Sequence, residues 1–178
     1  MAKQQSDVQA KILEAVEQQL RRAGDRSLTL ETVATETGCA KGLVNYHFKS
    51  KGDLLAAAAG KLFRDREDLW KTALKADEPD AVFQQAWNLI NLEVSGGFWN
   101  AWASLSASKH TMTVQTVNAA TTSFNASLAI SLDALLRNMG LSPTKPLYGS
   151  CYQVGQLLQR YGRGETHVAK QRVQRNGE

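Results

Sequence analysis

The sequence predicts an all-α protein. Apolar residues recur three and four positions apart along most of the 178 residues, and this spacing places them on one face of a helix instead of alternating as in a strand. Only three prolines interrupt the chain, and runs of β-branched residues are scarce. Glycines fall between the periodic stretches, where they commonly end one helix before the next begins.

The amino-terminal stretch predicts a first helix from Asp7 to Ala23. Ser6 precedes it as a candidate cap, and Gln9 stands where it completes a capping box, in which two side chains satisfy free backbone N–H groups of the first turn. Apolar residues return every three or four positions and form one stripe that can be buried. Gly24 follows at a position where glycine commonly ends a helix.

Two shorter helices should follow, with a break between them at Gly38. Thr29 is a candidate cap for the first of them, because its hydroxyl can accept a hydrogen bond from the opening turn. The second extends from about Ala40 to Phe48. Val44 and Phe48 stand four positions apart, so both should face the same core.

A long fourth helix is predicted from Ser50 to about Lys75, with Ser50 as its cap and Asp53 three residues on. Its roughly 25 residues would span about 37 Å at a rise of about 1.5 Å per residue. Leucine, alanine and aromatic residues recur along it at helical spacing. Such a helix would connect the amino-terminal helices rigidly to the rest of the chain.

The second half of the chain predicts further helices that are separated by clear breaks. A proline suited to a first helical turn stands at position 79, a Ser-Gly-Gly sequence covers 95–97, and the segment 141–146 contains two prolines. The last roughly 15 residues are polar and predict either a frayed helix or a disordered tail. The predicted helices cover residues 80–94, 98–108, 112–138 and 147–161.

These elements predict one domain over residues 1–50 and a second over 51–178. Residues 1–66 carry a formal net charge of +3, residues 67–155 a net charge of −2, and residues 156–178 again +3. A basic module on a slightly acidic body suits nucleic-acid binding by the first part alone. Ordinary surface charge would explain the same distribution equally well.

The sequence contains no feature that directs the chain into a membrane. The first residues lack the apolar segment of a signal peptide, and no apolar run approaches the roughly 18 residues of a membrane span. Cys39 and Cys151 are too few and too far apart for a disulfide framework, which indicates a reducing compartment. We therefore expect a soluble, cytoplasmic protein.

The segment from Thr29 to Lys51, TLETVATETGCAKGLVNYHFKSK, is the most informative part of the chain. It consists of two short predicted helices with a tight turn at Gly38. In a helix-turn-helix motif, the first helix crosses the DNA backbone and the second enters the major groove. The pattern therefore predicts that residues 1–50 bind double-stranded DNA.

Side chains of this segment suit both kinds of contact that DNA recognition requires, to phosphates and to base edges. Hydroxyl, imidazole and ammonium groups can donate to phosphates. A lysine can reach guanine, an asparagine matches adenine, a leucine can touch a thymine methyl group, and a glycine permits close backbone approach. Each of these side chains, taken singly, also has an ordinary structural explanation. Tyr46 and Phe48 could be core aromatic residues, His47 could be a packed residue, and the lysines could form a solvated face. The candidate DNA-binding residues are Thr29, Lys41, Gly42, Leu43, Asn45, Tyr46, His47, Lys49 and Lys51.

This region resembles the DNA-binding part of the TetR family of bacterial transcriptional regulators. The resemblance implies a homodimer that binds a palindromic operator through its amino-terminal modules. It also implies that the carboxy-terminal helices form the dimer and hold a small effector. Ala40 stands where the family usually has a capping serine, and Asn45 stands where it commonly has a tyrosine, so Tyr46 would have to supply that phosphate contact. The matching positions are Thr29, Val33, Ala34, Gly38, Gly42, His47, Phe48, Lys51, Leu54 and Leu55.

The second predicted domain begins with an aromatic-rich region, since all four tryptophans lie between residues 70 and 102. Aromatic walls with a few polar groups are typical of small-molecule pockets. Aromatic residues at helical spacing also build solid cores, so both readings stay open. The candidate effector-binding residues are Phe63, Arg66, Trp87, Asn91, Phe98, Trp99, Trp102, His110 and Met112.

These observations favour a nucleoid-associated transcriptional regulator, a repressor that a small hydrophobic or aromatic effector releases from its operator. The alternative is an effector-independent helix-turn-helix regulator, or an adaptor that acts through protein contacts, in which the aromatic region is solid core. An enzyme is not indicated, because the sequence has no metal-ligand spacing, no phosphate-binding glycine loop and no nucleophile elbow. We expect no cofactor and no metal.

Overall fold

The computed structural model describes residues 2–75 and 78–142, together with positions 147, 149, 153 and 156. The described residues form helices and no strands, which confirms the predicted all-α fold. The helices are α1 (Ala2–Ala23), α2 (Leu30–Thr37), α3 (Lys41–His47), α4 (Lys51–Ala73), α5 (Pro79–Ser95), α6 (Phe98–Ser106) and α7 (Thr111–Asn138).

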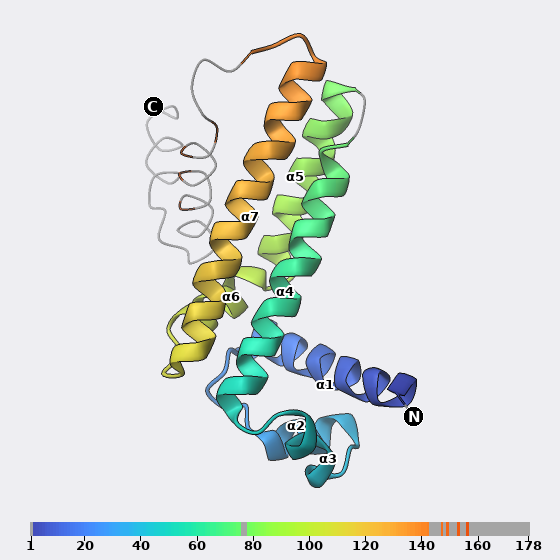
Figure 1. The fold of residues 1–178 in the computed structure, drawn as a ribbon, viewed down its shortest axis with the longest axis vertical. Helices are drawn as coiled ribbons and strands as arrows, with labels where there is room; N and C mark the ends of the chain where they lie inside the picture. The colour runs from blue at the N-terminus through green and yellow to red at the C-terminus, as the bar shows by residue number, and fades with distance from the viewer. Residues whose placement is uncertain are drawn as a thin grey trace, which may run out of the picture.

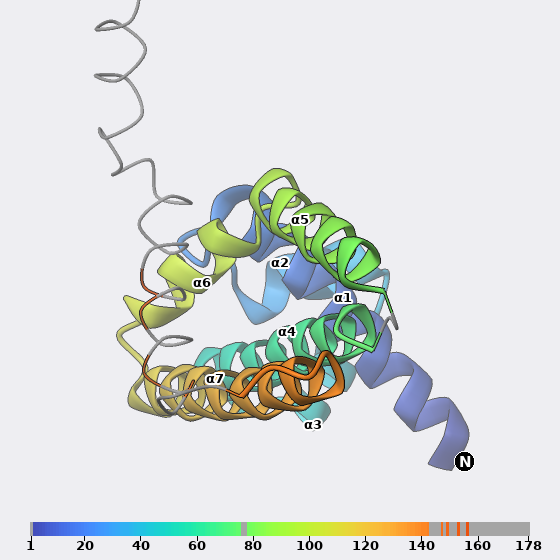
Figure 2. The same cartoon turned by 90° about the horizontal axis from the view of Figure 1, so that it is seen from above.

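The helices form a small amino-terminal part and an elongated second part (Figure 1). α1, α2 and α3 gather at one end of the molecule, beside the first turns of α4. From there α4 runs through the second part next to α7, and the two helices pack along much of their length. Seen from above, α5 and α6 lie across from the pair formed by α4 and α7 (Figure 2). The long helix α4 therefore belongs to both parts.

One apolar cluster holds the two parts together. Its amino-terminal portion comes from α1, α2, α3 and the first turns of α4, and its second portion comes from α4, α6 and α7. Burial of each large side chain contributes about 1.5–3 kcal/mol to the free energy of unfolding. Because the cluster is continuous, the amino-terminal helices are packed against the second part and are not joined to it by a loose linker. The large side chains with the lowest exposure are Ile12, Val16, Leu20, Leu28, Val33, Val44, Leu54, Leu55, Leu62, Phe98, Leu105 and Val117.

Local sequence signals set several helix boundaries as predicted. The Thr29 hydroxyl accepts a hydrogen bond from the Thr32 N–H at 3.0 Å, and the Thr32 hydroxyl accepts one from the Thr29 N–H at 2.9 Å. Ser50 caps α4 by accepting from the Asp53 N–H at 3.1 Å. Both predicted caps are therefore confirmed. Ala40 precedes α3 without a side-chain cap.

The predicted start of the first helix is wrong. α1 begins at Ala2, so Ser6 lies within the helix and does not cap it. The residues ahead of Ser6 include alanine, lysine and glutamine, which extend a helix at little cost. A capping pattern is thus an unreliable boundary where good helix formers precede it.

The later helices end close to their predicted limits. Pro79 occupies the first turn of α5, where its missing N–H leaves no hydrogen bond broken. α7 ends at Asn138 and is followed by Gly140 with φ of 75°. Positions 147, 149, 153 and 156 are helical, and the rest of the predicted helix at 147–161 and the predicted tail lie outside the described residues. Among the helices of the described part, none is long and apolar enough to cross a membrane.

Candidate nucleic-acid interface and ligand cavity

A buried seam and a tight turn hold α2 and α3 together. Gly38 ends α2 with a left-handed backbone, φ 66°, and its N–H donates to carbonyls at the end of the helix. Thr37 is buried, and its hydroxyl donates to the carbonyl of Val33 at 2.7 Å. Val33 of α2 and Val44 of α3 are both fully buried in the core. The inward faces of the two helices are thereby fixed, and the opposite face of α3 is left to solvent.

The outward face of α3 carries most of the predicted DNA-binding side chains. Lys41, Gly42 and Asn45 are exposed, and Leu43 is half-buried. Tyr46 is 60% exposed, which is high for a large aromatic residue. The Lys49 ammonium lies 5.5 Å from the centre of its ring, an arrangement in which the cation is attracted to the aromatic face. This face therefore combines a cation, an amide and a phenol on one short helix.

Gly42 is a notable member of this face because the chain's own packing does not require it. Its backbone is helical, and no atom lies within 4 Å of the place that a Cβ would occupy. Glycine in a helix costs about 0.5–1 kcal/mol of stability relative to alanine. An alanine would fit at this position of the chain without a clash.

Other predicted DNA-binding residues already have contacts within the chain. Lys51 is half-buried and its Nζ donates to the carbonyl of Asp25 at 2.5 Å, which fastens α4 to the loop after α1. The Thr29 hydroxyl is used in the cap of α2. His47 is half-buried between the rings of Tyr46 and Phe48. Lys41 pairs with the Glu31 carboxylate at 3.3 Å, and both side chains are exposed enough to separate when a phosphate or base competes.

The second part of the molecule contains an apolar cavity of about 420 Å³ between α4, α5 and α7. Its wall is almost entirely aliphatic and aromatic, with Arg66 and Asn125 as polar members. A cavity of this size and character suits a small, largely apolar ligand. The lining residues are Arg66, Trp70, Leu74, Pro79, Val82, Phe83, Ala86, Ile90, Phe124, Asn125, Leu128, Leu132, Leu135, Leu136, Met139 and Leu147.

A buried ion pair forms one end of this cavity. Arg66 donates from Nε to Glu93 Oε1 at 2.6 Å and from Nη2 to Oε2 at 3.2 Å. The Trp70 indole N–H donates to the same Oε1 at 2.7 Å. The guanidinium also lies 3.9 Å from the centre of the Phe124 ring and 4.7 Å from that of Phe98. Arg66 therefore touches all four helices of the second part, α4 through its own backbone and α5, α6 and α7 through its side chain.

The predicted effector-binding residues lie in several different environments in the structure. Arg66 lines the apolar cavity. Phe63, Phe98 and Trp99 are buried in the core, and Trp102 is packed against it. Trp87, Asn91 and Met112 are exposed to solvent. His110 lies at the start of α7, with its ring against Gly52 of α4.

Sequence reasoning missed most of the cavity wall, and above all its α7 side. Phe124, Leu128, Leu132, Leu135 and Met139 stand three or four positions apart on α7 and line the cavity together. That spacing is visible in the sequence. The tryptophans drew attention to α5 and α6 instead, where Phe98 and Trp99 are core residues and Trp87 is exposed.

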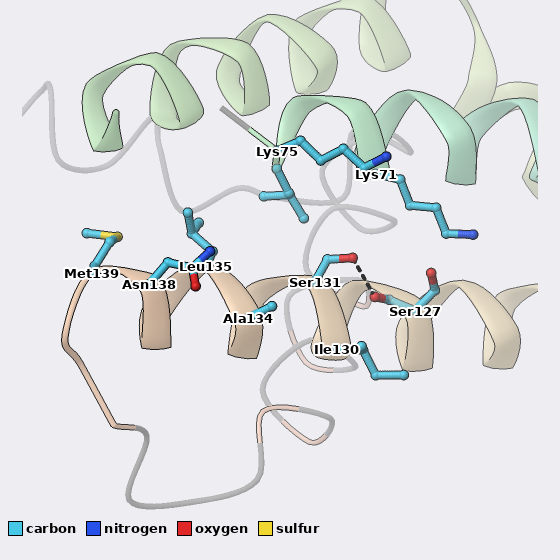
Figure 3. Close-up of a pocket in the computed structure, with 10 residues that line it drawn as sticks. Lys71, Lys75, Ser127, Ile130, Ser131, Ala134, Leu135, Asn138 and Met139 are labelled. Carbon is cyan, nitrogen blue, oxygen red and sulfur yellow. Dashed lines mark hydrogen bonds between the residues drawn. The ribbon is translucent and has the colours of Figure 1, made fainter. Parts of the chain in front are cut away.

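A second hollow, of about 490 Å³, lies between the carboxy-terminal parts of α4 and α7 (Figure 3). Its polar members include Lys71 and Lys75 of α4 and Ser127 and Ser131 of α7. Lys71 pairs with Glu67 at 2.7 Å, and this hydrogen bond lowers the pKa of Glu67 and raises that of Lys71. The wall of this hollow is more polar than that of the first cavity.

Helix α6 connects the cavity region to the end of α1. Asn100 donates from Nδ2 to the carbonyl of Arg21 at 3.0 Å, and the Ser104 hydroxyl both accepts from the Asp25 N–H and donates to its carboxylate at 2.8 Å. Gly97 has φ of 74°, and a Cβ there would stand 2.5 Å from the Arg21 carbonyl oxygen. These contacts clamp α6 directly onto the amino-terminal part.

A charged contact connects α1 to α4 as well. The Glu17 carboxylate accepts from Arg21 at 2.8 Å and from Lys61 at 3.2 Å. Burial lowers the pKa of Lys61, but hydrogen bonds to Asp65 and Glu17 raise it, and the net pKa lies above its ordinary value. The Lys61 ammonium therefore stays charged across neutral pH. Motion of α4 or α6 can reach α1 through these polar contacts as well as through the core.

The geometry defines a class of protein, a helix-turn-helix DNA-binding domain followed by a helical domain with an apolar cavity. Residues 12–58 match the family described as "Bacterial regulatory proteins, tetR family". The amino-terminal part of the chain is therefore similar to the DNA-binding domain of the TetR family of bacterial transcriptional regulators. No curated protein matches the sequence.

Two solved structures share the fold over nearly the whole chain. One is a protein of Pseudomonas aeruginosa PAO1 described as a transcriptional regulator, with 19% identity, a TM-score of 0.66, and coverage of 95% of this chain and 86% of that one. The other is a TetR transcription regulatory protein from Mycobacterium vanbaalenii, with 21% identity, a TM-score of 0.65, and coverage of 91% and 94%. At these identities the similarity establishes the fold.

Proposed function

We propose that this TetR-family DNA-binding regulator is a repressor that a small apolar effector releases from its operator. In this proposal residues 1–50 bind the operator, residues 51–178 bind the effector, and the carboxy-terminal helices pair two copies into a homodimer. The protein acts in the cytoplasm, on the nucleoid. The exposed polar face of α3 is the observation that carries the DNA-binding part, and the apolar cavity is the one that carries the effector part.

Three residues form the centre of the proposed operator interface. Lys41 and Asn45 stand one turn apart on α3 and are exposed, so both can reach base edges in the major groove. Gly42 between them lets the backbone of α3 approach the DNA without a side chain in the way. Tyr46 and Lys49, at the end of the helix, would position the module by phosphate contacts.

In this proposal the dimer has two states, one that binds the operator and one that binds the effector, and the effector releases the operator by favouring the second. The DNA-bound state places the two α3 helices about 34–36 Å apart, so that both enter the major groove on one face of the duplex. An effector that fills the cavity between α4, α5 and α7 would favour a different arrangement of these helices. Since α4 starts immediately after α3, and α6 is clamped to α1, a shift of either helix changes that separation. A coupling free energy of about 1–3 kcal/mol would change operator affinity by about 5- to 150-fold.

The alternative of an effector-independent regulator predicts a solid second domain. The cavity of about 420 Å³ favours the sensor. Fluorescence anisotropy tests the DNA-binding step, using the purified protein with labelled DNA from upstream of its own gene and with random DNA. We expect binding to the upstream DNA at least about 10³-fold tighter than to random DNA, with affinity that falls steeply as salt rises. Weak binding that is indifferent to sequence, at this and at other candidate operators, would contradict the proposal.

A further inference from the structure

We infer that the effector is a neutral, mostly apolar molecule with one hydrogen-bond acceptor, which accepts from Arg66 or Asn125, the polar side chains of the cavity wall. The inference rests on the proposed function, because it gives the chemistry of the ligand for that same cavity. The volume of about 420 Å³ equals roughly 14 water molecules at about 30 Å³ each, which corresponds to a ligand of about a dozen non-hydrogen atoms.

Asn125 is the first observation. It lies on α7 and lines the cavity, yet its side chain is only 4% exposed. Among the described residues, its amide makes no hydrogen bond of the kind that Thr113 makes on the same helix. Polar groups in the interior of a protein are normally hydrogen-bonded. A ligand in the cavity would supply the missing partner.

Arg66 supplies a second donor at the same cavity. Its Nε and Nη2 are used by Glu93. Within the part of the chain that the structure describes, Nη1 has no hydrogen bond, although the whole residue is only 9% exposed. The guanidinium is held in place by the rings of Phe124 and Phe98. A carbonyl oxygen could therefore accept from a donor whose position is already fixed.

The charges around the cavity select a neutral ligand. The positive charge of Arg66 is balanced by Glu93, which is itself 8% exposed and also accepts from Trp70. A carboxylate on the ligand would place a second negative charge beside a guanidinium that is already paired, within an apolar wall. A cationic ligand would meet Arg66 before it met Glu93. In both cases one buried charge would remain uncompensated, which is strongly unfavourable.

A series of compounds with one carbon skeleton tests this chemistry. The neutral probes are phenyl pentyl ketone and hexylbenzene. The charged probes are the carboxylate 6-phenylhexanoate and the cation 6-phenylhexylammonium. The four compounds have similar size and differ in the polar group. Their dissociation constants are measured by calorimetry with the full chain. We expect the ketone to bind about tenfold tighter than hexylbenzene, since a hydrogen bond to a charged donor is worth about 1.5 kcal/mol or more. Both charged probes should bind at least about tenfold more weakly than the ketone.

Two variants locate the polar contact. Asn125→Leu keeps a similar volume and removes the amide, so the preference for ketone over hexylbenzene should fall to a few-fold while hexylbenzene still binds. Asn118→Leu, on an exposed part of α7, should leave both dissociation constants unchanged. Circular dichroism checks that each variant is folded. The probe series on the unchanged protein tests the inference independently of either variant.

Each pattern of binding has a distinct meaning. Tightest binding by phenylhexanoate or phenylhexylammonium overturns the neutral-ligand inference and leaves the cavity as the proposed effector site. Equal binding of ketone and hexylbenzene removes the role of Arg66 and Asn125. Failure of every probe to bind overturns both this inference and the effector part of the proposed function. The predicted order of affinities without any release of operator DNA keeps the ligand chemistry and overturns only the proposed function.

Discussion

Gly42 allows protein stability and DNA binding to be separated at a single residue. It is exposed on α3, and a Cβ would meet no other atom of the chain. Gly42→Ala should therefore raise the free energy of unfolding by a few tenths to about 1 kcal/mol, as expected for alanine in a helix. The same methyl group would lie between α3 and the DNA, so operator affinity should fall about tenfold or more.

Urea unfolding and operator anisotropy measure the two effects of this substitution. Gly60→Ala is not a suitable control, because a Cβ there would lie 3.2 Å from Arg64. Gly38 and Gly140 have left-handed backbones and are unsuitable too. An exposed helix position such as Thr122→Ala on α7 is a better control for helix propensity. An unchanged operator affinity for Gly42→Ala would remove the close-approach argument.

Asn45 and Lys51 should behave differently, although the sequence suggested DNA contacts for both. Asn45 is exposed on α3, so Asn45→Ala should weaken discrimination at one base pair by about 1–3 kcal/mol. Lys51 donates to the Asp25 carbonyl, so Lys51→Met should lower stability and weaken binding to all sequences alike. Competition with single-base operator variants distinguishes the two. If Asn45→Ala keeps the wild-type order of preference, Asn45 does not read a base.

The buried pair of Arg66 and Glu93 makes a third residue-scale prediction. Glu93→Gln would leave the guanidinium without a counter-charge in an apolar environment, and removal of one member of such a pair costs about 3–5 kcal/mol. Glu14→Gln, on the exposed face of α1, should cost less than about 0.5 kcal/mol. Urea denaturation measures both. Similar values for the two variants would mean that Arg66 and Glu93 are not a buried pair in solution.

At the scale of elements, the contact of α6 with α1 can be tested with a pair of matched glycines. Gly97 and Gly140 have nearly the same left-handed φ, 74° and 75°. A Cβ on Gly97 would stand 2.5 Å from the Arg21 carbonyl oxygen, whereas a Cβ on Gly140 would have nothing within 4 Å. Gly140→Ala should therefore show only the left-handed backbone cost of about 1–2 kcal/mol.

Gly97→Ala should cost more than Gly140→Ala and should also alter the operator affinity, because α6 must move away from α1. Thermal unfolding and operator anisotropy of the two variants give the comparison. Equal effects of both substitutions on stability and on DNA binding would show that the contact between α6 and α1 transmits nothing to α3.

The sequence predicts elements well where the signal is local. The caps at Thr29 and Ser50 and the breaks at Gly38 and Gly140 depend on the chemistry of neighbouring residues, and the structure contains all four. The cap at Ser6 fails because helix formers precede it, and nothing local stops the helix from extending.

The ligand cavity could not be predicted in the same way. Whether Trp99 becomes core or Phe124 lines a cavity depends on how far α5 lies from α4 and α7, and no short sequence pattern encodes that distance. In the sequence, Asn125 lies in a stretch of small polar residues that has no pattern typical of a pocket. Only the structure shows that this side chain is buried. The sequence did indicate the class of residue that a pocket uses, and Arg66 is the predicted member that lines it.

At the scale of the whole molecule, the surface of α3 and the apolar cavity belong to one packed body. α4 contributes to both, and the core is continuous from α1 to α7. A ligand can shift the DNA-binding equilibrium only by the difference between its affinities for the two states. In the proposed function, that difference would reach α3 through α4 and through the contacts between α6 and α1.

Operator release by a cavity ligand can be tested by measuring the operator affinity with and without the ligand. Labelled operator DNA is titrated with the wild-type protein in the absence and presence of saturating phenyl pentyl ketone, with the Asn125→Leu variant in parallel. We expect the ketone to weaken operator binding by the wild-type protein by about 5-fold or more. The Asn125→Leu variant should need more ketone for the same release. Operator affinity that stays unchanged at a ketone concentration shown by calorimetry to fill the cavity would contradict the claim.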